Sequence, residues 1–301
     1  MKFTARNMMA WACAWVLIRL GYVRKALEKA HQGEYIISFY FHKPTKREFE
    51  SCIQWFLKHK FHFLSIDDLG EIIEGKRPFP KGAVLITVDD GWQSNEKSIV
   101  DTAIKYGVPV TIFVSTEPVE QGAYWWSYAS QAKHAGHPSV SREVLKIIPN
   151  EERLKYIRRI QKRVKLEREA LTVEQVQRIS KTGQVTIGGH THTHPILVNC
   201  TEKSVMEELY MSKFKLEHWT GRKVESFAYP NGDYREREIE VLKTLGYRYA
   251  FSTRPVYLTK EELADRYELP RFGFLEGGSF SENVCRMSGV WKFFVQKVGL
   301  S

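Results

Sequence analysis

The sequence predicts an α/β protein, an irregular (β/α) barrel of about seven parallel strands with an inserted basic helical segment. Short apolar, β-branched runs alternate along the chain with segments of helical periodicity, a pattern typical of parallel sheets covered by helices. Two of these runs end in clusters of acids or histidines. Functional side chains of such folds collect at the carboxyl ends of the strands. A chain of 301 residues is long enough for a barrel-sized domain.

The composition indicates a globular protein with an anionic partner. Apolar residues make up 43% of the chain and charged residues 27%, as in proteins that bury a large core. The net charge of +10 favours phospholipid headgroups, a diphosphate-linked glycan or nucleic acid. No recognition motif accompanies the charge, so we expect no nucleic-acid partner. The cysteines indicate no disulfide framework and fit a reducing compartment, because they lie far apart at Cys13, Cys52, Cys200 and Cys285.

Residues 1–30 are expected to form an N-terminal amphipathic helix. Met8 to Ile18 is almost wholly apolar, and basic residues flank it on both sides: Lys2, Arg6, Arg19, Arg24 and Lys25. About eleven apolar residues are too few for a membrane span, which needs roughly twenty. We interpret the segment as an interfacial helix anchored by tryptophan and arginine. A helix packed on the domain and a cleaved signal peptide are the alternatives.

The barrel, residues 31–301, is predicted to begin with a β-rich run from Tyr35 to Phe41, which His42 follows directly. Helical periodicity then predicts helices over Thr45–His59 and Asp67–Glu74. A histidine at a strand end is most often an ordinary surface or core residue, so His42 gains interest only from its wider setting.

The next apolar run, Ala83 to Val88, ends in Asp89-Asp90-Gly91. Two carboxylates directly after a buried strand are costly unless something uses them. Neighbouring side chains on an extended chain point opposite ways, so one carboxylate can bind a cation while the other faces a substrate. An ordinary Asp-Gly turn is the alternative.

A helix over Asn95–Tyr106 and a strand over Val108–Val114 are predicted next, followed by an aromatic cluster, Tyr124 to Tyr128. Trp125 and Trp126 lie at the centre of this cluster. Aromatic faces suit the apolar faces of pyranose rings, so these two side chains are candidates for substrate binding. Aromatics that cover the barrel core are the alternative.

The predicted insertion, at about residues 130–170, interrupts the barrel pattern. Ser141–Ala170 has apolar residues at helical spacing and is expected to form a helix with a basic face: Arg158, Arg159, Lys162, Arg163 and Lys165. A solvated charged face and contact with a membrane surface or an anionic glycan are the two interpretations.

A strand over Val185–Ile187 leads into Gly188-Gly189, and His190, His192 and His194 follow in alternate positions. Neutral imidazole is the commonest metal ligand, and several together suit zinc, iron, cobalt or nickel. A polar loop rich in histidine is the alternative. A metal site also needs a ligand from elsewhere, and the Asp-Asp pair is the candidate.

The last third of the chain continues the alternation of helices and strands. The expected elements are a helix from Thr201 to Trp219, a strand at Val224–Tyr229, a turn at Pro230–Gly232, a helix at Arg235–Leu245, and strands at Tyr247–Ser252 and Tyr267–Phe272. The C-terminal segment Val290–Val298 again combines aromatics with lysine. It is expected either beside the N-terminal helix on a membrane-facing surface or packed on the barrel.

The motifs Thr87-Val88-Asp89-Asp90-Gly91 and His190-Thr-x-x-His194 resemble the first two motifs of the NodB-homology polysaccharide deacetylases, carbohydrate esterase family 4. The resemblance implies that Asp89 is the general base and that Asp90, His190 and His194 bind the metal. His192 is then not a ligand.

The region before the Asp-Asp motif is similar to the circularly permuted members of this family, which include the poly-N-acetylglucosamine de-N-acetylases. The similarity lies in a strand followed by His42-Lys-Pro, a helix containing Phe49, and the stretch Phe61 to Leu69. In that group the motif bearing the general-acid histidine precedes the Asp-Asp motif, which implies that His42 is the acid.

Phe227-Ala228-Tyr229-Pro230-Asn231-Gly232 resembles the third family motif, in which an arginine normally orients the base. Ala228 replaces that arginine, so we expect Arg271 to supply the guanidinium. The Asn231 backbone N–H matches the position that helps to hold the oxyanion, and Tyr229 and Pro230 are further candidates for substrate binding. We found no counterpart of the family's tryptophan-bearing fourth motif.

These observations predict a metal-dependent hydrolase that removes an N-acetyl or similar N-acyl group from an amino sugar of a cell-surface polysaccharide or lipid-linked glycan. One divalent ion is expected, zinc first, with cobalt, nickel and iron as alternatives. A catalytically weak glycan-binding protein on the same barrel is the alternative function.

The basic composition, the amphipathic ends and the lack of a clear signal peptide predict a cytoplasmic protein bound peripherally to the inner face of the cytoplasmic membrane. A secreted or periplasmic protein is the alternative.

Overall fold

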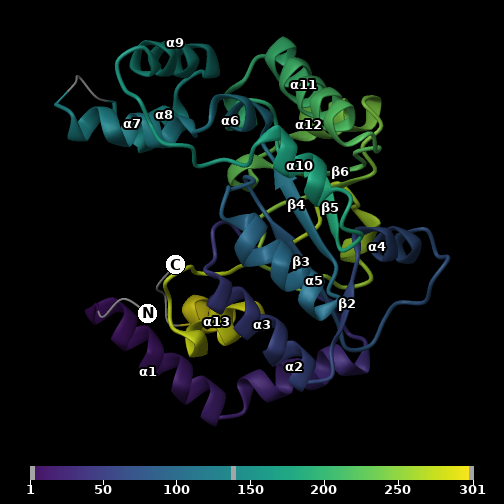
Figure 1. The fold of residues 1–301 in the computed structure, drawn as a ribbon. Helices are drawn as coiled ribbons and strands as arrows, with labels where there is room; N and C mark the ends of the chain where they lie inside the picture. The colour runs from purple at the N-terminus through teal and green to yellow at the C-terminus, as the bar shows by residue number, and fades with distance from the viewer. Residues whose placement is uncertain (1–3, 137–139, 298–301) are drawn as a thin grey trace.

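The computed structural model describes residues 4–136 and 140–297. Lys2, residues 137–139 of the predicted insertion and Val298 lie outside this part of the chain. The described strands form one parallel sheet (Figure 1) and are β1 (Ile37–Phe41), β2 (His62–Leu64), β3 (Ala83–Val88), β4 (Val110–Val114), β5 (Val185–Gly189), β6 (Ser226–Ala228), β7 (Tyr249–Phe251) and β8 (Phe272–Gly273). Seven of them follow the order β7-β6-β5-β4-β3-β1-β8, and β2 pairs with β3.

The sheet curves into a barrel that is nearly closed between its end strands. A parallel bridge joins Phe251 of β7 to Leu269, just before β8. The predicted irregular barrel of about seven parallel strands is therefore confirmed. The expected strand Tyr267–Phe272 is shorter than predicted, because only Phe272 and Gly273 form it. Pro270 stands between the bridge and β8, and proline has no N–H to donate to a ladder.

Helices surround the sheet and contact their neighbours in sequence order. They are α3 (Lys46–Lys58), a π-helical turn (Glu96–Val100) that continues into α5 (Asp101–Tyr106), α10 (Val173–Ile179), α11 (Glu202–Thr220) and α12 (Glu236–Thr244), and α4 (Ile66–Ile73) follows β2. Side chains cap the first turns of several of these helices. Thr45, Ser65 and Thr172 each form a reciprocal capping box with the residue three positions later.

The core has two layers, one on each face of the sheet. On β3, Val84, Ile86 and Val88 pack against the outer helices, whereas Ala83 and Leu85 face the barrel interior. Both sets of side chains are buried, as expected of a strand in a parallel sheet. This rigid strand places Asp89 and Asp90 at its carboxyl end.

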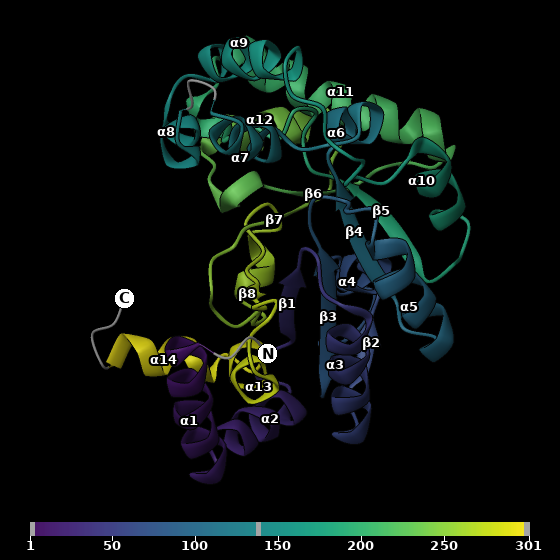
Figure 2. The same cartoon turned by 60° about the vertical axis from the view of Figure 1, so that its left-hand side comes forward.

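The insertion consists of several helices instead of the single predicted one. After α6 (Thr116–Gln121), the chain forms α7 (Trp125–His134), α8 (Arg142–Ile147) and α9 (Asn150–Gln161) above the carboxyl ends of the central strands (Figure 2). The expected helix Ser141–Ala170 is broken at Ile148, which is extended because proline at position 149 disfavours a helical residue before it. The chain leaves helical structure after Gln161.

The N-terminal region forms two helices, α1 (Ala5–Arg19) and α2 (Tyr22–Gln32), instead of the single helix expected over residues 1–30. Gly21 separates them with a left-handed backbone, φ 80°. Helix α1 packs on α13 (Phe280–Met287), and α14 (Val290–Lys297) contacts α13 and α2. Within the described ranges, no helix combines the length and apolar character needed to cross a membrane.

Candidate active site

The two adjacent aspartates leave β3 in different directions. The Asp89 N–H still donates to the Phe41 carbonyl, 2.8 Å away, and so continues the ladder between β3 and β1. Asp90 adopts a left-handed backbone, φ 76°, and the chain turns there. Gly91 follows with φ 84°, close to Val114, where a side chain would be both strained and crowded. The turn gives each carboxylate its own set of partners.

Asp89 is held by a buried arginine. Both nitrogens of the Arg271 guanidinium end donate to its carboxylate: Nη1 lies 2.7 Å from Oδ1 and Nη2 lies 2.9 Å from Oδ2. Arg271 is fully buried and also donates to the Thr87 hydroxyl and the Ser252 carbonyl. Paired, charge-assisted bonds of this kind fix the plane of a carboxylate. Arg271 thus occupies the position expected of the guanidinium that Ala228 cannot supply.

Asp90 lies between two histidines from the end of β5. Its Oδ1 is 3.5 Å from His190 Nε2 and 3.3 Å from His194 Nε2, and the three potential ligand atoms lie within 4.8 Å of one another. Burial raises the pKa of Asp90, but the two imidazoles outweigh it and hold the pKa well below its usual range. Burial lowers the pKa of His194. An anionic carboxylate and neutral imidazoles are the forms that bind a divalent ion.

The surrounding contacts also suit a metal site. His190 Nδ1 is 2.7 Å from the Ala228 carbonyl, to which it donates, and this contact turns Nε2 toward Asp90. The Trp92 indole N–H donates to the other Asp90 oxygen at 2.9 Å. The imidazole–carboxylate separations exceed the roughly 2.7–3.2 Å of an ordinary N–H···O bond. The three ligand atoms therefore lie close together but too far apart for ordinary hydrogen bonds, and a bound ion would give each of them a partner.

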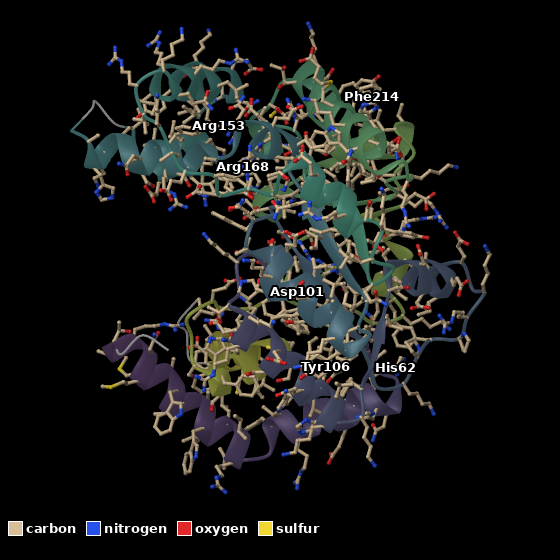
Figure 3. The ribbon with its side chains drawn as sticks, in the orientation of Figure 1. His62, Asp101, Tyr106, Arg153, Arg168 and Phe214 are labelled. Carbon is tan, nitrogen blue, oxygen red and sulfur yellow. The ribbon has the colours of Figure 1, made fainter. Side chains whose placement is uncertain are left out.

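The loop that carries the histidines is strained and firmly held. Thr191 and His194 have positive φ values of 65° and 53°, which are rare outside glycine. The Glu208 carboxylate accepts the backbone N–H groups of His192 and Thr193 and the Thr193 hydroxyl. From the inner side of α9, the buried Arg153 donates to Thr193 Oγ1 at 3.0 Å (Figure 3). The inserted helices therefore help to position the loop that carries the candidate metal ligands.

Two glycines let the histidine strand approach its neighbours closely. A Cβ on Gly188 would lie 2.4 Å from the Phe113 ring, and one on Gly189 would lie 2.7 Å from the Tyr247 hydroxyl. Such contacts require the backbone to move. The Gly188-Gly189 pair therefore sets the position from which His190 reaches Asp90.

We expect Glu117→Gln to stabilise the protein at about pH 8 and to have little effect at about pH 5. Burial, followed by repulsion from Glu208, raises the pKa of Glu117 from 4.5 to about 7. The unfolded chain loses this proton first, so ionisation destabilises the fold as the pH rises through this window. The shift corresponds to roughly 3 kcal/mol. Urea unfolding of both proteins at the two pH values measures the difference, and equal effects at both would contradict this prediction.

A pocket of about 450 Å³ opens above the acid–histidine cluster. Its lining includes all of the predicted chemical residues except Arg271: Asp89, Asp90, His190, His194, His42 and Asn231. The His42 ring lies edge-on to Tyr40, and Glu276 accepts its backbone N–H at 2.7 Å. Asn231 has φ 61°, and within the described residues its backbone N–H makes no hydrogen bond. The N–H is therefore free to receive a ligand.

A scan against protein-family profiles matches residues 76–250, more than half of the chain, to the polysaccharide deacetylases. The chain belongs to the polysaccharide deacetylase family. The matched span contains Asp89, Asp90 and both metal-binding candidates of the histidine loop. His42 and Arg271 lie outside it, yet the fold brings both to the same site because β1 and β8 are neighbours in the sheet.

Curated relatives include deacetylases of the expected subgroup. The chain is 22% identical over 221 residues to a putative polysaccharide deacetylase, YxkH, of Bacillus subtilis, covering 73% of this chain and 62% of the relative. It is 23% identical over 235 residues to a poly-beta-1,6-N-acetyl-D-glucosamine N-deacetylase of Staphylococcus epidermidis, covering 75% and 66%. The chain therefore spans somewhat less than two thirds of the length of these two relatives.

Solved structures of the family share the fold. The Streptococcus pyogenes deacetylase PplD, solved with acetate, superposes with a TM-score of 0.62 at 17% identity, covering 84% of this chain and 97% of that one. IcaB from Ammonifex degensii gives a TM-score of 0.60 at 17% identity, covering 85% and 97%. The predicted resemblance to the family and its poly-N-acetylglucosamine deacetylase subgroup is confirmed.

The four predicted substrate-binding residues have different environments. Trp126 is half-buried on the pocket wall and stacks on Tyr124, with ring centroids 4.5 Å apart. Trp125 borders the pocket but is buried, and its indole N–H donates to the His194 carbonyl. Tyr229 and Pro230 are buried and do not line the pocket, and the Tyr229 hydroxyl donates to the Tyr267 carbonyl. Trp126 is the member of the four that presents a partly exposed ring to a ligand.

Sequence reasoning missed several residues that shape the site. Trp92 contacts Asp90, Glu276 holds the backbone after β1, and Arg153 and Glu208 secure the histidine loop. Trp92 directly follows the Asp-Asp-Gly motif, and this position could have identified it as a residue of the site. The other three come from distant parts of the chain, and nothing in their local sequence distinguishes them from surface charges.

Proposed function

We propose that this protein is a metal-dependent hydrolase that removes an N-acetyl or similar N-acyl group from an amino sugar of a cell-surface polysaccharide or lipid-linked glycan. One observation carries the proposal. Asp90, His190 and His194 gather beside an arginine-held Asp89 on one wall of a pocket that opens to solvent. A metal site and a separate base are the two components that hydrolysis of an amide requires.

Asp90, His190 and His194 would hold one divalent ion, with zinc preferred and cobalt, nickel or iron as alternatives. When bound, the ion supplies Lewis acidity toward the acyl carbonyl and the attacking water. The protein supplies the remaining chemistry. Asp89 accepts a proton from the water as its oxygen attacks the carbonyl carbon, and Arg271 keeps the Asp89 carboxylate oriented.

His42 and Asn231 complete the reaction. The Asn231 backbone N–H donates to the oxygen of the acyl group as negative charge develops there. His42 protonates the sugar nitrogen while the carbon–nitrogen bond breaks, because an amide nitrogen leaves poorly as an anion. The products are a carboxylic acid and a free amino sugar.

Three basic side chains at the pocket favour a phosphate-linked sugar over a neutral polymer. Lys43, Arg142 and Lys146 line the pocket, and none of them forms a salt bridge with another described residue. Lys43 Nζ lies 4.3 Å from the centre of the Trp92 ring, and Lys146 is 3.4 Å from the Asn231 amide oxygen. A phosphate or diphosphate beside the N-acylated sugar would complement this charge.

We also propose that the protein acts in the cytoplasm, at the inner face of the cytoplasmic membrane. Its four cysteines are free, and three of them are buried. Free thiols suit a reducing compartment. A location at a membrane agrees with the proposed lipid-linked substrate class.

Acid release provides the test of function. The purified protein, loaded with zinc, is incubated with N-acetylated and N-formylated amino sugars, both free and linked through phosphate to a lipid. We expect release of acetate or formate, fastest from a phosphate-linked sugar, and an unprocessed N-acylated glycolipid in a deletion strain. Binding of the sugars without acid release from any of them would favour the alternative, a glycan-binding protein on the same barrel.

A further inference from the structure

Helix α1 has apolar side chains on both of its faces. On the inner face, Ala10, Ala14 and Leu17 recur at helical spacing and are buried against the domain. Arg6 adds a salt bridge to the buried Glu282 of α13, and the Cys285 thiol contacts the Ala14 carbonyl. Helix α2 continues this contact through Val23, Leu27 and its neighbours in the main core. The inner face therefore accounts for the packing of α1, but not for its outer side chains.

The outer face of α1 exposes large apolar side chains that no described residue covers. Their exposed fractions are high: Met8 54%, Met9 68%, Trp11 48%, Trp15 48%, Val16 46% and Leu20 67%, with Tyr22 of α2 at 51% and Phe293 of α14 at 41%. Side chains along this edge of the molecule point away from the rest of the chain (Figure 3). Exposed apolar residues that stand singly are common, but a contiguous group of eight marks an interaction surface.

An apolar groove of about 990 Å³ runs beside this face. Helices α1, α2 and α14 form its walls, with Val16, Leu17, Leu20, Phe293 and Phe294 among the lining residues. Lys25 and Lys29 of α2 also line it. Glu34 lines it too and pairs with Lys29 at 2.7 Å, whereas Lys25 forms no salt bridge with another described residue. The groove is thus an apolar channel with a cationic side chain at its wall, which matches a lipid with an acyl chain and an anionic headgroup.

The charges around the helix point to the same partner. Residues 1–27 contain five basic residues and no acid. Arg6 pairs with Glu282 and Arg24 with Glu28, and the other described basic residues of this range, Arg19 and Lys25, form no salt bridge with a described residue. The Arg19 guanidinium lies 5.2 Å from the centre of the Trp15 ring, so a cation and an amphipathic aromatic project together at the edge of the apolar face. Tryptophan and arginine at the boundary of an apolar face are typical of helices that lie in the plane of a membrane interface.

We infer that the outer face of α1, with the neighbouring parts of α2 and α14, docks on the surface of an anionic lipid bilayer. The apolar side chains enter the acyl region, the groove receives a lipid chain, and the basic residues contact anionic headgroups. A second copy of this chain is a poorer fit, because two such surfaces would bring their positive charges together. This surface does not depend on the proposed catalytic activity, and its test requires none.

Point variants test the surface better than deletion of residues 1–30, because α1 and α2 contribute buried side chains to the core. The first variant, Trp11→Gln/Trp15→Gln/Leu20→Gln, removes outward apolar side chains from α1. Its matched control is Met206→Gln/Tyr210→Gln/Phe214→Gln, which removes three exposed side chains from α11 at the opposite end of the molecule (Figures 1 and 3). Unchanged circular dichroism and thermal midpoints would show that both proteins remain folded.

The measurement is flotation of the full-length protein with phosphatidylcholine vesicles that do or do not contain phosphatidylglycerol. We expect the wild type and the α11 control to float with the anionic vesicles, and the α1 variant to bind at least about tenfold more weakly. Vesicles with brominated acyl chains should quench tryptophan fluorescence in the wild type, and less so in the α1 variant. Equal binding by all three proteins would overturn the inference.

A second pair of variants, each of which loses three positive charges, tests the headgroup contacts. Arg19→Gln/Arg24→Gln/Lys25→Gln should weaken binding to anionic vesicles by roughly a hundredfold, since each cation near such a surface contributes about a factor of five. Arg158→Gln/Arg159→Gln/Lys162→Gln, at the end of α9 and just after it, removes the same charge from the other end of the molecule and should change binding little (Figure 2). One combination of results would refute the inference and assign the face to self-association. The wild type would bind no lipid and would sediment as a dimer, and the apolar α1 variant would sediment as a monomer.

Discussion

His190→Ala and Asp90→Asn are each expected to abolish binding of one divalent ion per chain, and with it all measurable deacylase activity. Both residues offer a ligand atom to the same cluster. A catalytic metal with three protein ligands loses most of its affinity when one is removed. Activity should fall below detection, because the base alone cannot polarise the acyl carbonyl. Elemental analysis after gel filtration measures the ion, and acid release measures the activity.

His192→Ala is the matched control for the metal prediction. His192 lies on the same loop, but its Nδ1 is 2.8 Å from the Thr116 hydroxyl, and the ring does not line the pocket. This variant should keep one ion per chain. Full metal occupancy in both His190→Ala and Asp90→Asn would show that the ion, if any, binds elsewhere. Loss of the ion in His192→Ala alone would reassign the ligands.

The parts of the site that could be predicted lie at the ends of buried strands. The runs before Asp89 and His190 are apolar and β-branched, and both form central strands, β3 and β5. Because parallel strands end at the same edge of the sheet, two local patterns were enough to bring the acids and histidines together. The fold class followed from the same alternation of short strands and helices.

Features that depend on long-range packing were harder to predict. Arg271 meets Asp89 across the sheet from a segment 182 residues away, and only the missing arginine at Ala228 suggested such a partner. Arg153 sits in a helix whose other basic residues are exposed, and its local sequence does not reveal that it points inward. The Tyr229 side chain follows strand β6 into the core, where its hydroxyl finds the Tyr267 carbonyl. A motif position therefore did not predict whether a side chain reaches the pocket.

Asp89 and Asp90 have different hydrogen-bond partners, which suit the two carboxylates to different roles. Asp89 has a permanent cation on both of its oxygens, whereas Asp90 faces two imidazoles and one indole N–H. These partners fit the proposed roles, with Asp89 as a base that Arg271 orients and Asp90 as a metal ligand.

His42→Ala is expected to lower kcat on an N-acyl sugar by about 10²- to 10⁴-fold, with a smaller change in KM. The proposed role of His42 begins only when the amine leaves, so metal binding and folding should be unchanged. His42 is half-buried, and within the described residues its ring nitrogens make no hydrogen bonds that the substitution would break. Elemental analysis and thermal unfolding check the metal and the fold, and steady-state kinetics of acid release measure the loss.

An activated ester of the same acyl group separates general-acid catalysis from other roles of His42. The alcohol of such an ester leaves without prior protonation, so His42→Ala should retain most of its activity on the ester while it fails on the amide. Asp89→Asn should fail on both substrates, because water must be activated before either bond can break. Equal losses on amide and ester in His42→Ala would mean that this histidine binds substrate or supports the pocket. The general acid would then have to be another group. His192 is the first candidate to test, but its ring contacts Thr116 and does not line the pocket, so the loop would have to move before His192 could protonate the amine.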